Sequence, residues 1–525
     1  MIHRRRKMES GTALKPAHGT AKHGLGRRLV RGCAVGCAGV ALLFIAAIVL
    51  LVLFLGKVPK AYPPATRPIA ASPAGTNLGG GLDGFESPYL GHTGSWDGKG
   101  GGMFGSSKTP DLDKERAMGL RWTFMPVYWR VLERTGPVDL SRETPPAWQA
   151  LDAFIIAAKE RGLNVLMQAP VVGGNAGGPP DWAGRREQGK SAPANMDALA
   201  EFAGKLAERY RPGGTLARRQ GWAESYGVRA WELDNEPESY RTNWKGQAAD
   251  YAEFVALAVA RIKAADPQAV IVAPGLAGGK HGLPWLEATL DAPAMAGSPV
   301  FRVQGKPYSI GPAVDVVSLH NYEGLDSAFS DDSRTIGQVF DDVSGVFAKW
   351  EQRVPGFTYA RKQEYWHTEG NFDFLGLLSS ERRAAWRFQF LTRAFAAGIR
   401  KVVVMDASPL EQVAVRAYVS ALPNPFPMLE ASNEIVVVRG QIATFRHPEG
   451  AAPDAGQVWV VWPLANSGNA TVEIPVRRPE VQVVSVNGTS QTITADQGRV
   501  RFELKGDSKM SPGVLILDRF VPTGR

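Results

Sequence analysis

A glutamate at the end of an apolar stretch is the first residue in this sequence with a chemical pattern around it. Residues 228–238 read Val-Arg-Ala-Trp-Glu-Leu-Asp-Asn-Glu-Pro-Glu, which places Glu236 directly before Pro237. Because proline cannot donate a ladder hydrogen bond, a strand here must stop and leave Glu236 at its C-terminal end. An Asn-Glu-Pro triplet alone is more often a surface loop with a solvated glutamate. The rest of the chain has to decide between these readings.

Polar residues also end two later apolar runs. Residues 320–322 read His-Asn-Tyr, and residues 367–371 read His-Thr-Glu-Gly-Asn. Glu236 and Glu369 are therefore a possible pair of catalytic carboxyls. Glycoside hydrolysis needs such a pair, because one carboxyl protonates the leaving oxygen while the other attacks the anomeric carbon, and a gap of about 5 to 5.5 Å permits a covalent intermediate. The alternatives are two unrelated loop glutamates and, for His320, a buried hydrogen-bonded histidine.

The elements that must position these residues alternate regularly. Short apolar runs predict strands, and segments with apolar residues every three or four positions predict helices. We expect a first strand near residues 77–78 and further strands at 120–126, 163–169, 228–234, 269–273, 314–319, 363–368 and 400–405. We expect helices at 111–119, 147–162, 195–211, 248–265, 284–291, 335–351, 381–397 and 411–421.

This α/β alternation favours a parallel sheet, and eight units favour a closed (β/α)8 TIM barrel over residues 76–422. Glu236 and Glu369 would then end the fourth and seventh strands, on opposite sides of the barrel mouth, where such barrels keep their chemistry. The chain changes character after this region. Short β-rich runs and the hairpin signal Asn487-Gly488 predict a C-terminal antiparallel β-sandwich domain over residues 423–525.

The N-terminal region predicts a membrane anchor. Residues 1–31 hold nine basic residues and one acid, and residues 32–56 hold no charge. As one transmembrane helix the second segment would reach roughly 37 Å, enough to cross a hydrocarbon core of about 30 Å. It is too long for a cleavable signal peptide. The charge asymmetry places residues 1–31 in the cytoplasm and the bulk of the chain outside the cytoplasmic membrane, in the periplasm or at the cell surface.

Composition narrows the class of partner and cofactor. The net charge is +9, and all but one unit of it lies in residues 1–31, so the folded part is nearly neutral and nucleic acid is not an expected partner. Cys33 and Cys37, the only cysteines, lie in the apolar segment, which excludes a disulfide framework or a cysteine-based zinc site in the globular part. The five prolines of residues 57–75 predict an extended linker.

The order of strands, with Trp-Glu-Leu-Asp-Asn-Glu-Pro on the fourth and Trp-His-Thr-Glu-Gly on the seventh, resembles the retaining glycoside hydrolases of clan A. The motif Leu-Asp-Asn-Glu-Pro, followed by residues 262–267, looks most like family 44, with family 39 close behind. The resemblance implies a glycosidase that cuts a β-linked polysaccharide and needs no metal or organic cofactor.

The same resemblance implies roles for individual residues. Glu236 would be the general acid/base and Glu369 the nucleophile. Asn235 would bind the sugar 2-hydroxyl or the nucleophile, while His320 and Tyr322 would orient the two carboxylates. Candidate sugar-stacking rings, for which packing is the alternative role, are Trp129, Trp182, Trp244 and Trp366.

Two departures from the clan keep a second hypothesis open. An arginine is common near the end of the second strand, where residues 124–126 read Phe-Met-Pro. A tryptophan is common on the last strand, where residues 404–407 read Val-Met-Asp-Ala. The alternative is a catalytically silent barrel that binds glycan or a polysaccharide-biosynthesis partner. Lyase chemistry has no metal cluster or catalytic lysine to support it.

Overall fold

The computed structural model of the protein describes most of the chain from residue 83 onward. The described residues are 83, 85–92, 111–172, 178–186, 192–222, 226–239, 244, 248–277, 279–292, 301–303, 306–308, 314–323, 334–353, 364–372, 378–405, 407–423, 425, 428–429, 434–446, 457–464, 468–506 and 513–518.

Eight parallel strands close into a barrel, which confirms the predicted (β/α)8 architecture. In pairing order they are β1 (Tyr89–His92), β2 (Trp122–Tyr128), β3 (Asn164–Val171), β4 (Ala230–Glu232), β5 (Val270–Ala273), β8 (Val316–His320), β9 (Glu364–Glu369) and β10 (Lys401–Met405). The barrel closes where Tyr89 of β1 lies opposite Val402 of β10. Their carboxyl ends therefore share one mouth.

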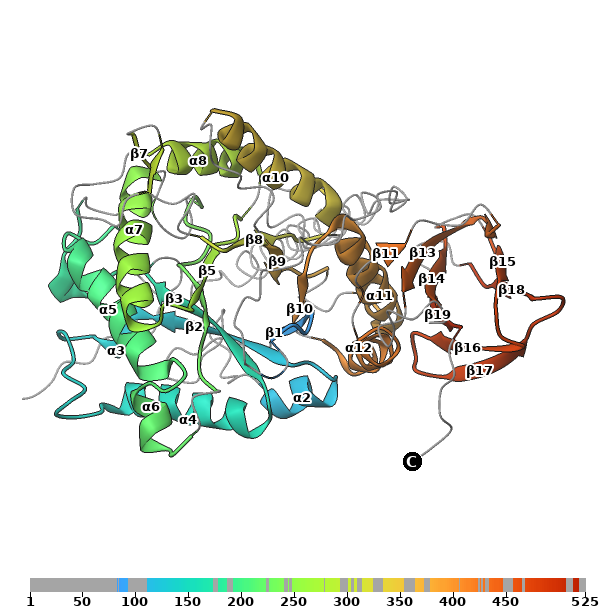
Figure 1. Cartoon of the computed structure of the whole chain (residues 1–525), viewed down its shortest axis with the longest axis horizontal. Helices are drawn as coiled ribbons and strands as arrows, with labels where there is room; N and C mark the ends of the chain where they lie inside the picture. The colour runs from blue at the N-terminus through green and yellow to red at the C-terminus, as the bar shows by residue number, and fades with distance from the viewer. Residues whose placement is uncertain are drawn as a thin grey trace, which may run out of the picture. The chain divides into compact units, whose positions relative to one another are not determined.

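Helices connect and surround these strands (Figure 1). They are α2 (Leu112–Ala117), α3 (Trp129–Leu132), α4 (Pro146–Glu160), α5 (Met196–Tyr210), α6 (Thr215–Arg219), α7 (Ala248–Ala265), α8 (Gly279–Asp291), α10 (Ile336–Arg353), α11 (Ser380–Ala397) and α12 (Pro409–Ala421), with a short 3₁₀ turn η2 at Asp181–Ala183. A small ribbon of β6 (Phe301–Val303) and β7 (Lys306–Tyr308) precedes β8.

The expected first strand was wrong. We predicted it near residues 77–78, which lie outside the described residues, and the barrel instead uses β1 at Tyr89–His92. Two features hide this strand in the sequence: it has only four residues, and one of them is Gly91. A Cβ at Gly91 would overlap the carboxyl of the buried Glu115, so the glycine lets that side chain lie against the strand. A fully buried strand can therefore look like part of a glycine-rich loop.

The N-terminal end of the barrel is filled by aromatic rings around one buried cation. Lys401 Nζ donates hydrogen bonds to the backbone oxygens of Phe85 and Ser87, and it lies 4.6 Å from the ring centroid of Trp122 and 5.0 Å from that of Trp366. Burial lowers the pKa of Lys401 to about 8. Because this packing fills the N-terminal end of the barrel, we expect a functional site at the carboxyl ends of the strands.

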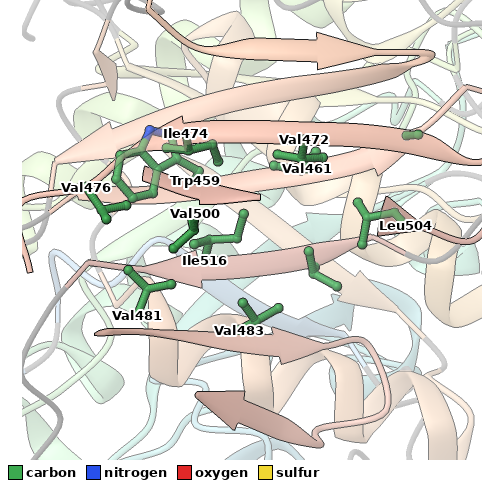
Figure 2. Packing of buried hydrophobic residues seen from close by; sticks show 12 residues of the cluster. Trp459, Val461, Val472, Ile474, Val476, Val481, Val483, Val500, Leu504 and Ile516 are labelled. Carbon is green, nitrogen blue, oxygen red and sulfur yellow. The ribbon is translucent and has the colours of Figure 1, made fainter. Parts of the chain in front are cut away.

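The C-terminal region forms two antiparallel sheets, which confirms the predicted sandwich. One has the order β11 (Met428–Leu429), β13 (Gly440–Arg446), β14 (Gln457–Pro463), β19 (Val514–Leu517), β16 (Glu480–Ser485) and β17 (Ser490–Thr494); the other is β12 (Val436–Val438), β15 (Ala470–Pro475) and β18 (Arg499–Leu504). Figure 2 shows one hydrophobic core shared by both sheets, with Trp459, Val483 and Ile516 from the first and Val472 and Val500 from the second.

Among the described residues, no helix has the length and apolar character needed to cross a membrane. The predicted basic tail (1–31), anchor (32–56) and linker (57–75) lie outside them.

Candidate active site

Glu236 follows β4 in a strained turn. Asp234 and Glu236 both have positive φ, 70° and 41°, which is uncommon for residues with a side chain. The buried Asp234 carboxylate supports this turn: Oδ1 accepts from the backbone N–H of Asn235 at 2.8 Å and of Val172 at 3.3 Å, and Oδ2 accepts from Trp244 Nε1 at 2.8 Å. The strain is therefore held by the surrounding structure, as is typical of functional sites.

The residues predicted at three strand ends meet at the barrel mouth. His320, at the end of β8, has Nδ1 3.0 Å from Glu236 Oε1. Tyr322 donates a short hydrogen bond from its hydroxyl to Glu369 Oε1. One carboxylate oxygen of Glu236, one ring nitrogen of His320 and one carboxylate oxygen of Glu369 all lie within 4.8 Å of one another. The structure thus brings the two glutamates together, with one orienting partner each.

These three side chains also offer the donor atoms that bind ions such as Zn²⁺. An ion held there would occupy both carboxylates and compete with chemistry performed by the carboxylates themselves.

The buried charges of the site influence one another. Burial alone would lower the pKa of His320, but the carboxylates of Glu369, Glu236 and Glu232 outweigh it and raise the pKa to about 9. Burial raises the pKa of Glu369 to about 7, with help from Glu236, while His320 and the Tyr322 hydroxyl act in the opposite direction. At neutral pH the imidazole therefore carries a proton, and Glu369 is close to its titration point.

Two further buried histidines stay neutral beside His320. Burial and the charge on His320 lower the pKa of His92, at the end of β1, to about 3. Burial, His320 and Arg387 lower the pKa of His367 on β9 well below its usual range. Of these three histidines, only His320 therefore carries a positive charge at neutral pH.

Asn235 lies next to Glu236 and is half-buried, so it keeps some surface for a ligand. Its Oδ1 accepts a hydrogen bond from Gln168 Nε2 of β3 at 3.1 Å, which fixes the orientation of the amide. Two residues after Glu369, Asn371 accepts a hydrogen bond at its Oδ1 from the buried Arg387 of α11, at 3.2 Å. The same guanidinium donates to the backbone oxygen of Met405 at 2.7 Å. The two Arg387 contacts tie the segment that follows Glu369 to the end of β10.

Three of the four predicted stacking rings are corrected by their burial. Trp129, Trp244 and Trp366 have no exposed surface, so none of them can present a ring face to a sugar. Trp129 packs on Phe202 of α5, Trp366 lies in the barrel core, and Trp244 supports the Asp234 turn. In each case apolar burial, the commoner fate of a large aromatic, decides the role.

Trp182 of η2 keeps part of its surface exposed. Its Nε1 donates to the backbone oxygen of Glu133 at 2.6 Å, and its ring meets Trp129 edge-on with centroids 5.4 Å apart. A ring held from two sides is already oriented for stacking, so Trp182 remains the candidate platform.

Sequence reasoning missed a buried carboxylate beneath the site. Glu232 of β4 is fully buried, with Oε1 accepting from the backbone N–H of Gly275 at 3.2 Å and from Thr368 Oγ1 at 3.0 Å. The signal was present: a strand has a period of two, so Glu232 must share the inward face of Ala230, which lies in the barrel core. His92 was missed because its strand was not recognised.

No family model and no curated protein matches the sequence. Among solved structures, a glucosidase from Croceicoccus marinus is 12% identical with a TM-score of 0.51, over 87% of this chain and 98% of that one. AbfB, a family 51 α-L-arabinofuranosidase from Bifidobacterium longum, is 11% identical with a TM-score of 0.51, over 87% and 97%. A thermostable GH51 α-L-arabinofuranosidase from Thermotoga petrophila RKU-1 is 14% identical with a TM-score of 0.50, over 87% and 98%.

The chain shares its fold with these three solved glycosidases. At these low identities the likeness speaks for the fold, and the resemblance drawn from the strand-end motifs is confirmed at that level. The assignment to family 44 or family 39 stays a prediction.

The histidine charges can be measured without any substrate. In ¹⁵N-histidine spectra of the full chain, we expect the His320 ring to lose its proton near pH 9, His92 to titrate only near pH 3, and His367 to titrate only well below the usual histidine range. The signal that disappears in His320→Gln identifies His320. A His320 ring that titrates near pH 6.5, as in an unfolded chain, would contradict the described electrostatics.

Proposed function

We propose that the protein is a retaining glycoside hydrolase that cleaves a β-linked polysaccharide through Glu236 and Glu369. The observation that carries the proposal is the approach of the two carboxylates to within 4.8 Å at the ends of β4 and β9. Retaining enzymes hold their carboxyls about 5 to 5.5 Å apart, whereas inverting enzymes need about 6.5 to 9.5 Å to admit a water. The fold shared with known glycosidases supports the same conclusion.

In the first step, Glu369 attacks the anomeric carbon. The glycosidic carbon–oxygen bond breaks, an ester forms between the sugar and Glu369, and Glu236 protonates the leaving oxygen. The Tyr322 hydroxyl, which donates to Glu369 Oε1, leaves the other carboxylate oxygen as the nucleophile. In the second step, Glu236 takes a proton from water, the water oxygen bonds to the anomeric carbon, and the ester bond to Glu369 breaks.

His320 can supply the proton for the first step. Its Nδ1 is 3.0 Å from Glu236 Oε1, so a proton on the imidazole can pass to the Glu236 carboxyl, and rotation of that carboxyl presents it to the leaving oxygen. Glycosyl transfer removes the negative charge of Glu369, after which the proton taken from water can return to His320. No other charge change is required.

Asn235 and Trp182 are the residues we propose for sugar recognition outside the reacting centre. Asn235 has an oriented amide beside Glu236, and Trp182 has a partly exposed ring held in place. The apolar run at residues 32–56, with its basic flank, supports a location outside the cytoplasmic membrane, where a polysaccharide in the periplasm or at the cell surface would be the substrate.

Conservative substitutions of the two glutamates test this function. The full chain is incubated with a panel of β-linked polysaccharides and aryl β-glycosides, and new reducing ends or released phenol are measured. We expect Glu369→Gln to lose activity on every substrate. Glu236→Gln should lose about 10²–10⁴-fold on polysaccharide and much less in the first step with an activated aryl group, which leaves without a proton. Glu115→Gln removes another fully buried carboxyl and should retain activity.

Unchanged hydrolysis in both glutamate variants would contradict the mechanism. Glycan binding that persists in Glu369→Gln, with no substrate ever cut by the natural sequence, would favour the silent-barrel alternative.

The pH profile follows from the two charges. Glu369 must be ionised to attack, so kcat/KM should rise as pH increases through about 7. The proton on His320 must be present, so kcat/KM should fall as pH increases through about 9. Steady-state rates on the best aryl substrate of the panel measure both limbs. A maximum near pH 5 would contradict these assignments.

A further inference from the structure

His320 faces a second carboxylate on the side away from Glu236. Glu232 Oε1 lies 4.0 Å from His320 Nε2, while Nδ1 of the same ring lies 3.0 Å from Glu236 Oε1. Glu232 and the His320 side chain have no exposed surface. The imidazole therefore lies between the carboxyl of Glu232, the last residue of β4, and that of Glu236, four residues later.

Three strands hold Glu232 in this place. Glu232 projects from β4, Thr368 Oγ1 donates to it from β9, and the backbone N–H of Gly275 donates to it just after β5. Gly275 also makes room for the imidazole, because a Cβ at that position would overlap the His320 ring. The strand ends are thus shaped to place the ring and the carboxyl beside each other.

The charge state of this pair follows from its donors. Burial raises the pKa of Glu232, while the positive charge on His320 and hydrogen bonds from Ser318, Gly275 and Thr368 oppose it. If the carboxyl held the proton, these donors would face a neutral group and lose strength. These donors therefore favour the ionised carboxylate beside the protonated imidazole, against the effect of burial.

Other titratable groups also face His320 from the elements around it. They are Glu236 and Glu238 after β4, Glu369 and His367 on β9, and His92 on β1; Arg334 lines a small cavity next to the ring. Of these, Glu236 and Glu369 belong to the proposed chemistry, and the two histidines are neutral. Glu232 remains as the nearest carboxylate that the chemistry does not use.

We propose that Glu232 is a positioning residue that keeps His320 protonated and directs its Nδ1–H to Glu236. This inference rests on the proposed function, because a proton held there matters only if Glu236 delivers it. The proton moves from Nδ1 to Glu236 in the first step and returns in the second, while Glu232 stays ionised and bonded to nothing new. A purely structural role for Glu232 would fix the strand ends without affecting the proton.

The substitution Glu232→Gln separates the two roles, because it keeps an oxygen acceptor for Gly275 and Thr368 and removes the charge. In the full chain without substrate, we expect the ¹⁵N titration of His320 to move to lower pH by roughly one to three units, as loss of a charge 4.0 Å away implies. The alkaline limb of kcat/KM should move by the same amount, with the acidic limb less affected.

Glu115→Gln is the matched control, since it neutralises an equally buried carboxyl that packs against Gly91, and it should leave both quantities unchanged. Should Glu232→Gln fail to fold, Thr368→Val removes one donor to Glu232 and should give a smaller shift in the same direction. A folded variant in which the His320 titration stays in place would overturn the inference. Absence of any hydrolysis would count against the proposed function alone, because the titration needs no substrate.

Discussion

The burial of one positively charged imidazole among carboxylates is the constraint on which this site depends. A buried ion without partners is costly, and His320 keeps its proton only because Glu232, Glu236 and Glu369 surround it. The same charge acts in return on its neighbours. It opposes the rise that burial causes in the pKa values of Glu232 and Glu369, and it helps burial to keep His92 and His367 neutral. The charge on His320 therefore influences the protonation state of each of these four neighbours.

The fold supplies this cluster through strand ends and close backbone approaches. The barrel order β9-β8-β5-β4 places the ends of these strands near one another, so the side chains that follow them can meet. Gly275 lies where a Cβ would overlap the His320 ring, and Gly370 where one would overlap the backbone oxygen of Asn321. The positive φ of Asp234 and Glu236 turns the chain toward the mouth, held by the hydrogen bonds of Asp234. Strain and crowding are concentrated where the chemistry is proposed.

Periodicity sufficed to predict seven of the barrel strands, their helices and the two facing glutamates, because long apolar runs and Pro237 mark strand ends in the sequence itself. It failed at β1, where four residues with a glycine leave no pattern. In the C-terminal domain, β17 is a polar, largely exposed hairpin strand without an apolar run of its own, although Gly488, with φ 79°, confirms the predicted turn. The tryptophans show the remaining limit: only packing reveals that Trp129 and Trp366 are buried and that Trp182 is not.

The most direct measurement is covalent trapping of the nucleophile. The full chain is incubated with an activated 2-deoxy-2-fluoro glycoside of the sugar it hydrolyses best, which slows the second step more than the first, and the labelled peptide is identified by mass spectrometry. The account predicts one sugar per chain, bonded to Glu369, and no label in Glu369→Gln. Label on another carboxylate, or steady turnover with no trapped ester, would contradict the central claim.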